Sequence, residues 1–246
     1  MLHTLRSPRW AVATAVVLLV TAVLVGLGLW QLDRLEQRRA ENAIKQERLG
    51  FEQVPLDELL AEHPADVGGI EYRVATVSGA FDPSEEVLIR SQVELGQAGF
   101  HVITPLVTGD GVAVLVNRGW VPLAMDTPPV PAEPPEGEIG VEGWVHLTQT
   151  RPPLGAEEPE GDLDVLNRVD IDRIETQVPY HLEPVYLVEL GQGSDELPIT
   201  VDPPDFTDEG PHLAYAIQWF GFALVGLVGF FFLLRRQSGS AKRAQI

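Results

Sequence analysis

Two long, uninterrupted apolar runs, one near each end of the chain, dominate its pattern of hydrophobic and polar positions. The first covers residues 10–32 without a charged side chain, and the second covers residues 213–234 and stops at Arg235. Trp10 and Trp30 are separated by a helical length of about 30 Å, which matches the hydrocarbon core of a bilayer. Tryptophan is enriched at both interfaces of a membrane span. The pattern therefore predicts one transmembrane helix at each end.

A cleaved signal peptide is the alternative interpretation of the first run. The run is longer than the apolar core of such a peptide, and no small-residue cleavage site follows it. We therefore favour an uncleaved span.

The residues between the two runs form short β-branched stretches separated by Gly, Pro and Asp, which is typical of strands. Strands are expected at 71–80, 86–90, 100–107, 112–118, 140–147 and 185–190, with a hairpin turn at Thr108–Gly111. Apolar positions at helical spacing predict a short helix within 163–178. The fold class that follows is a membrane protein in which two transmembrane α-helices flank one α+β domain, mostly antiparallel β.

Charge is distributed unevenly along the chain, and this predicts its orientation. All 36 acidic residues lie between Asp33 and Glu209, whereas the two ends carry only basic residues. Basic residues flanking a span remain on the cytoplasmic side, so we expect both termini in the cytoplasm and the domain outside it. About nine residues before the first span leave no room for a mitochondrial presequence, which favours a bacterial plasma membrane.

The predicted organisation has five parts. These are a cytoplasmic tail at 1–9, a transmembrane helix at 10–32, an extracytoplasmic domain at 33–212, a second transmembrane helix at 213–234 and a basic cytoplasmic tail at 235–246. Within the domain, residues 33–48 are expected to form a charged helical stalk and residues 194–210 an acidic linker.

Composition argues against several classes of function. The chain has no cysteine, which excludes disulfides, thiolate metal sites and a cysteine nucleophile, and its two methionines make copper(I) delivery unexpected. A net charge of −19 disfavours nucleic-acid binding. The chain lacks phosphate-binding, zinc-protease and serine-hydrolase motifs, and its histidines have no helical ligand spacing. We therefore expect neither an enzyme nor a resident metal site.

Two groups of residues stand out before the second span. Trp30, Gln31 and Arg34 lie at the outer mouth of the first span, where Trp30 alone would also serve as an interfacial anchor. The second group follows an apolar strand and consists of Asn117, Arg118, Gly119 and Trp120. Either Arg118 pairs with a carboxylate while Gly119 allows a close backbone approach, or the group forms a partner-docking surface rich in hot-spot residue types.

A third group opens the second span, where His212, Tyr215 and Trp219 share one helical face. A histidine at this depth is either an interfacial residue bonded to backbone or water, or an axial haem ligand beside an aromatic wall.

Taken in order, these motifs resemble those of the Surfeit locus protein 1 family of cytochrome c oxidase assembly factors, and the chain is identified as a bacterial member. The most specific of them is VNRGWVP between two terminal spans. The resemblance covers nearly the whole chain and rests on WQLxR at Trp30–Arg34, EYRxxxVxGxF at Glu71–Phe81, GFHVITPL at Gly99–Leu106, VLVNRGWVP at Val114–Pro122 and HLxYAxxWF at His212–Phe220.

The resemblance implies an accessory membrane protein without catalytic turnover. It implies help with haem a insertion into, or maturation of, subunit I of a haem–copper oxidase, with subunit I, haem a synthase and the lipid bilayer as partners. It also implies His212 as a transient haem a ligand, with Tyr215 and Trp219 as a wall. Pro211 and Gln218 depart from the family's usual Asn and Thr. The alternative hypothesis is a membrane-anchored scaffold for another envelope complex, without haem.

Overall fold

The chain divides into two compact units, one made of the terminal segments 1–44 and 205–246, the other of residues 45–204. The computed structural model describes residues 8–64, 66–94, 96–152, 158–191, 196–201 and 206–243, with side chains up to Gln237 in the last segment. The predicted tail at 1–9 and the linker at 194–210 therefore lie partly outside the described residues. Each unit is described by itself.

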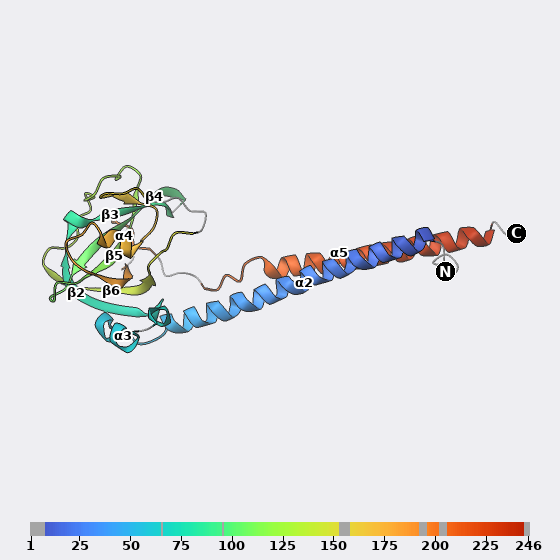
Figure 1. Ribbon diagram of the computed structural model, residues 1–246, viewed down its shortest axis with the longest axis horizontal. Helices are drawn as coiled ribbons and strands as arrows, with labels where there is room; N and C mark the ends of the chain where they lie inside the picture. The colour runs from blue at the N-terminus through green and yellow to red at the C-terminus, as the bar shows by residue number, and fades with distance from the viewer. Residues whose placement is uncertain are drawn as a thin grey trace. The chain divides into compact units, whose positions relative to one another are not determined.

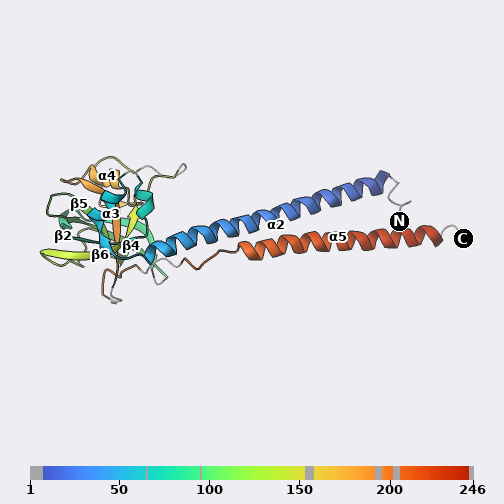
Figure 2. The same cartoon turned by 90° about the horizontal axis from the view of Figure 1, so that it is seen from below.

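The terminal unit consists of two long helices, α2 (Pro8–Leu49) and α5 (His212–Arg243). They run antiparallel and side by side, so that the N-terminal end of α2 and the C-terminal end of α5 lie at the same end of the pair (Figures 1 and 2). Pro8 suits the first position of a helix because proline has no N–H to donate. Both helices are long and apolar enough to cross a membrane. The charged stretch 33–48 continues α2 without a break, and α5 begins at His212.

Contact between α2 and α5 follows a seven-residue spacing along α2. Gly28, Leu35 and Asn42 are its buried residues, and Ala216 and Ala223 are buried on α5. A seven-residue spacing keeps one face of a helix against its neighbour. A Cβ on Gly28 would lie 2.6 Å from the Phe220 ring, so a larger residue there would displace that side chain.

Five small residues of the two apolar runs, a residue type that allows helices to approach closely, do not line this contact. A Cβ added at four of them would meet no described atom within 4 Å, and the fifth, Ala22, is exposed (Gly26, Gly221, Gly226 and Gly229 are the four). They lie on helix faces turned away from the partner helix, because their spacing does not match the seven-residue repeat of the buried positions.

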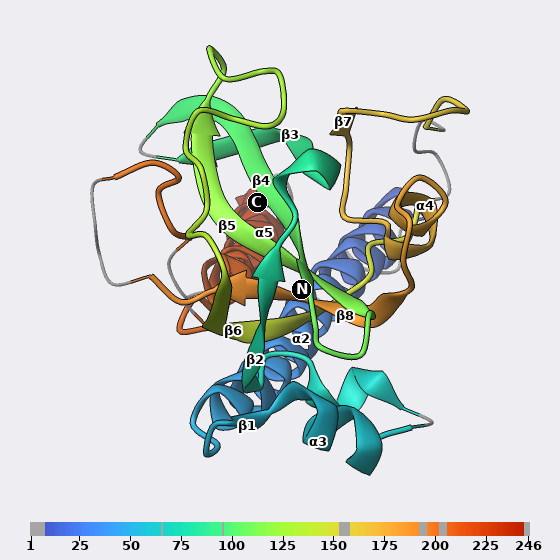
Figure 3. The same cartoon turned by 90° about the vertical axis from the view of Figure 1, so that its left-hand side faces the viewer.

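The central unit is built on one mixed sheet with strand order β1-β2-β6-β8-β5-β4-β3-β7 (Figure 3). A further pairing of β2 with β4 closes five of these strands into a barrel. The strands are β1 (Val54–Pro55), β2 (Val74–Phe81), β3 (Val87–Glu94), β4 (Gln97–Val107), β5 (Ala113–Pro122), β6 (Glu138–Leu147), β7 (Val165–Leu166) and β8 (Leu182–Glu189). The short helices are α3 (Leu56–Glu62), α4 (Ile171–Glu175) and the 3-10 turns Val67–Ile70 and Pro83–Glu85.

The barrel strands in chain order are β2, β4, β5, β6 and β8. Around the barrel the order is β2-β4-β5-β8-β6, with β5 and β8 parallel and the other neighbours antiparallel. This is the arrangement of a five-stranded Greek-key barrel of the OB type. A β-rich domain with mostly antiparallel pairing, as predicted, is confirmed, and the Thr108–Gly111 turn joins β4 to β5.

The alternation of side chains along the strands separates two cores. On β8, Val185 and Leu187 pack with α3, whereas Tyr186 and Val188 pack on the opposite face with α4.

Two predicted elements are wrong in extent. Only Ile171–Glu175 of the predicted helix 163–178 is helical, because Val165 and Leu166 pair with β3 and Asp170 then caps the helix start. The strand predicted at 112–118 continues through Asn117–Trp120 to Pro122, with a register shift opposite Val102 and Ile103.

Candidate functional site

The first turn of α5 meets α2 through a hydrogen bond between two side chains that the sequence singles out. Nδ1 of His212 lies 2.9 Å from Oε1 of Gln31. A carbonyl oxygen can only accept, so Nδ1 of His212 carries the proton and donates it. In the neutral imidazole, Nε2 then holds the lone pair. A bond of this kind to the other ring nitrogen is what fixes and orients a metal-ligating histidine.

The segment before α5 is tied to α2, and this positions His212. The buried Asn42 side chain donates to the backbone oxygen of Asp208 at 3.0 Å, and the Asp208 carboxylate accepts from the Gly210 N–H at 2.8 Å. Gly210 adopts a φ of 70°, and a Cβ there would lie 3.6 Å from Nε2 of His212. A glycine at 210 thus allows the turn and leaves space beside Nε2.

A bidentate ion pair also joins α2 to the segment before α5. Nε and Nη2 of Arg39 each lie 2.7 Å from a carboxylate oxygen of Glu209. The hydrogen bonds from Arg39 lower the pKa of Glu209 below its ordinary value. Both side chains are about half exposed, so solvent screens the pair and it contributes mainly orientation.

The remaining predicted residues of the helix unit lie at the surface around this bond. Tyr215 is 46 % exposed, and Trp219 is half-buried with its ring edge-on to Phe222. Trp30 is 48 % exposed, with the Arg34 guanidinium 5.7 Å from its ring centre. Of the three residues predicted at the mouth of the first helix, Gln31 is the one with a hydrogen bond to His212 among the described residues.

The VNRGWVP motif lies inside the central unit. The side chains of Asn117, Arg118 and Trp120 are buried. Arg118 forms an ion pair with the buried Glu86 at 3.3 Å and donates to the Ala132 backbone oxygen at 2.7 Å. The other Glu86 bonds come from the Thr104 hydroxyl and the Val130 N–H, each at 2.8 Å. This geometry supports the structural interpretation of Arg118 as the partner of a carboxylate.

Gly119 provides the close backbone approach that the motif suggests. Its φ is 132°, and a Cβ there would lie 2.3 Å from the backbone oxygen of Ile199. Trp120 on the same strand pairs with Ile199 through two backbone hydrogen bonds. Arg118 and Trp120, at 6 % and 4 % exposure, therefore hold the fold of this unit rather than present an open surface.

The sequence gives too weak a signal for two residues of these sites. Glu86 is one of many acidic residues, and Asn42 lies in a charged stretch where an amide is unremarkable. Their roles follow from burial, which no local pattern reports. Within the described residues, no three His, Asp or Glu side chains come together as a metal-binding group.

Comparisons with known proteins identify one family and several relatives that match most of the chain. The model of the SURF1 family matches residues 18–224. A SURF1-like protein of Mycobacterium tuberculosis is 26 % identical over 228 residues, which is 92 % of this chain and 83 % of the relative. A SURF1-like protein of Monosiga brevicollis is 27 % identical over 248 residues, 90 % of this chain and 87 % of that protein. Human Surfeit locus protein 1 is 35 % identical over 123 residues, 44 % of this chain and 40 % of its own length.

Proposed function

Because this chain belongs to the SURF1 family, we propose that it is an assembly factor for haem–copper cytochrome c oxidase, which assists haem a insertion into subunit I or the maturation of that subunit. It acts by binding and positioning, without catalytic turnover, and its partners are subunit I and haem a synthase. The motif order from Trp30 to Phe220, which resembles that of oxidase assembly factors, supports this proposal.

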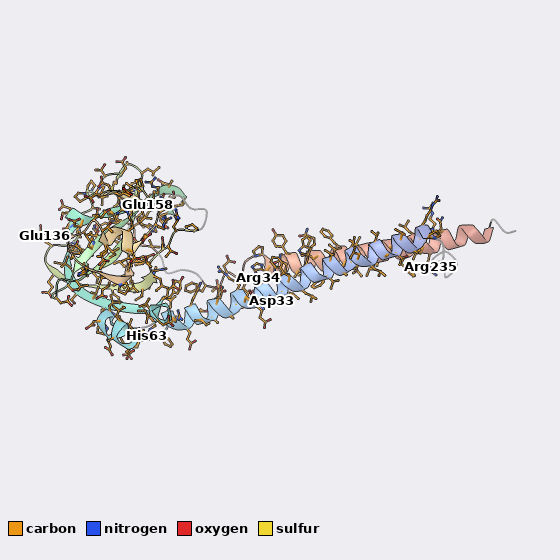
Figure 4. All side chains as sticks on the ribbon, in the orientation of Figure 1. Asp33, Arg34, His63, Glu136, Glu158 and Arg235 are labelled. Carbon is orange, nitrogen blue, oxygen red and sulfur yellow. The ribbon has the colours of Figure 1, made fainter. Side chains whose placement is uncertain are left out.

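We also propose that the protein resides in a bacterial plasma membrane, with α2 and α5 as its two spans. Asp33 and Arg34 bound the apolar run of α2 at one end of the helix pair, and Arg235 bounds that of α5 toward the other (Figure 4). Charges at these margins suit a helix pair whose apolar length matches a bilayer. The basic end then lies in the cytoplasm with both termini, and the central unit lies outside.

His212 is the residue that we assign to haem a. The single observation that carries this is its bond to Gln31, which places the proton on Nδ1 and leaves Nε2 free to coordinate iron. When bound, haem a supplies an iron atom that accepts an imidazole nitrogen. Gln31 orients the ring, Asn42 and Gly210 set the turn that precedes it, and Tyr215 and Trp219 supply aromatic surface on the same helix.

A membrane-anchored scaffold for another envelope complex is the second candidate, because such a scaffold would have the same charge pattern and the same two terminal helices as an assembly factor. Affinity purification of the full chain from membranes distinguishes the two. Oxidase subunits should co-purify with an assembly factor, whereas a scaffold for another complex would retain unrelated envelope proteins.

Deletion of the gene tests the proposed function. Membranes of the deletion strain should have a weaker haem a absorbance band and lower cytochrome c oxidase activity than those of the parent strain. Unchanged spectra together with unchanged activity would refute the proposal.

A further inference from the structure

The central unit contains a cavity of about 360 Å³ that none of the preceding roles uses. Its wall comes from β3, β4, β5, β6 and β8 and from neighbouring loops. No lining residue is charged, although the whole chain carries a net charge of −19. Ligand sites are commonly cavities of roughly 300–1,000 Å³ with apolar walls and a few placed polar groups. This cavity has that size and that character.

Flat rings form much of its wall. The His146 imidazole stacks on the Tyr186 ring with centres 5.4 Å apart and planes 20° apart. The Tyr72 ring meets the same imidazole edge-on at 5.1 Å, and the Trp144 indole does so at 6.5 Å. Aromatic rings attract one another in offset-stacked or edge-on geometry, so this wall can pack against a flat ligand ring in the same way.

The hydrogen bonds of Asn117 determine the proton position on the other cavity histidine. Oδ1 of Asn117 accepts from the Gly119 N–H at 3.0 Å, so its Nδ2 is the atom 3.1 Å from Nδ1 of His101. An amide nitrogen can only donate, so Nδ1 of His101 accepts and the ring proton sits on Nε2. His101 thus retains an Nε2–H that has no acceptor within the described part of the chain.

Like His101, two more residues of the wall have a hydrogen-bond donor without a described acceptor. The Tyr186 hydroxyl accepts from Gln149 at 3.2 Å, which leaves its own proton to donate. The buried Trp144 N–H has no acceptor among the described residues. Three donors of the wall, the His101 Nε2–H, the Tyr186 hydroxyl and the Trp144 N–H, are thus available to a ligand that supplies acceptors.

Burial keeps the two imidazoles neutral. Desolvation lowers the pKa of His101 and of His146 to about 4, so neither carries charge at neutral pH. An anionic ligand would meet no cation among the described lining residues, so the lining itself would not compensate the transfer of its charge out of water.

We propose that this cavity binds a flat, uncharged ring compound bearing carbonyl oxygens, with quinones as the ligand class. The ring lies among the Tyr72, His146 and Tyr186 rings, and its carbonyl oxygens accept hydrogen bonds from the His101 imidazole and the Tyr186 hydroxyl. This site lies in the central unit and does not depend on the oxidase-assembly proposal.

Equilibrium dialysis of menadione against the full chain in lipid nanodiscs tests the site, with empty nanodiscs as background. Menadione adds readily to thiols, and the absence of cysteine removes that reaction. We expect saturable binding of one menadione per chain. Methylnaphthalene, which has the rings without the carbonyls, and naphthoate, which is anionic, should both bind at least tenfold more weakly, on the order of one lost or uncompensated polar interaction.

Variants locate the binding. Tyr186→Phe removes one hydroxyl and keeps the stacked ring, and His101→Leu removes the imidazole donor. Each should weaken menadione binding roughly tenfold. The matched control is His181→Leu, which removes an imidazole that is 92 % exposed and outside the cavity wall, and it should bind as the wild type does.

Circular dichroism establishes that each variant is folded, and Tyr186→Phe keeps the test valid if His101→Leu does not fold. Three results would overturn the proposal: binding no greater than to empty nanodiscs, equal affinity of Tyr186→Phe and wild type, or equal affinity for methylnaphthalene and menadione.

Discussion

Nδ1 of His212, the first residue of α5, donates a hydrogen bond to Oε1 of Gln31 on α2 across 2.9 Å. These residues are 181 positions apart, and each belongs to a motif at one end of the family pattern. The bond joins the two motifs: one supplies the imidazole and the other supplies the oxygen that accepts from it.

The first prediction concerns this bond. Gln31→Leu retains His212 but removes its acceptor. The affinity of the purified protein for haem a should therefore fall roughly 10- to 100-fold, as for other orienting partners of metal ligands. The measurement is a haem titration followed by the Soret absorbance. Gln46→Leu makes the same change at an exposed site on the same helix and should bind haem like the wild type. Equal affinity of Gln31→Leu and wild type would show that Gln31 has no part in the site.

The second prediction concerns the buried ion pair of the central unit. Arg118→Met should lower the free energy of unfolding by about 3–5 kcal/mol, because the buried Glu86 carboxylate loses its countercharge. Glu86→Gln combined with Arg118→Met removes both charges but keeps an oxygen that can accept from the Val130 N–H, and it should be more stable than Arg118→Met alone. Thermal unfolding of the full chain in detergent, followed by near-ultraviolet circular dichroism, measures both. If the single variant were the more stable of the two, Arg118 would not neutralise Glu86.

The third prediction concerns the glycine of the same motif. Gly119→Ala combines a left-handed φ with a clash against the Ile199 backbone oxygen, and should cost at least about 1–3 kcal/mol. Gly140→Ala is the control, since a Cβ there meets no described atom within 4 Å and its φ is not positive. The melting temperature of Gly119→Ala should fall and that of Gly140→Ala should not. A drop of equal size in both would contradict the close approach.

The fourth prediction concerns pH. At pH 5 the imidazoles of His101 and His146 are neutral in the folded protein but charged in the unfolded chain, because burial lowers each folded pKa from 6.5 to about 4. The unfolded state therefore binds more protons, and stability falls as pH falls from about 6.5 toward about 4, by up to about 1.4 kcal/mol per pH unit for each imidazole.

His146→Gln isolates this contribution, because the carboxylates titrate in both proteins and cancel in the difference. The stability of the variant, measured by urea unfolding at several pH values, should decline less steeply than that of the wild type over this window. Parallel curves would show that His146 titrates alike in both states.

Much of the fold could be predicted because its signals are local. The apolar runs predict α2 and α5, and the β-branched stretches predict the long strands of the central unit. What could not be predicted depends on contacts between distant positions: the β2–β4 closure, the pairing of Glu86 with Arg118, and the helix face that α2 presents to α5. On α5, Ala216 and Ala223 are buried whereas a Cβ at Gly221, Gly226 or Gly229 would meet no described atom within 4 Å, a difference that depends on the phase of the helix contact.

In the candidate site too, the residues themselves could be predicted from local signals, whereas the contacts between them could not. Gln31 and His212 stood out by residue type and position, but only the structure joins them, since no spacing in the sequence reports a contact over such a separation. The charge-free cavity had no signal at all, because His101 and His146 lie on different strands at distances along the chain that match no motif.

The haem a absorbance of membranes from a deletion strain that re-expresses either the wild type or His212→Ala tests the central claim most directly. Oxidase assembly through His212 predicts that the wild type restores the haem a band, whereas His212→Ala, present at the same level in the membrane, leaves it weak. Full restoration of the band by His212→Ala would contradict the claim.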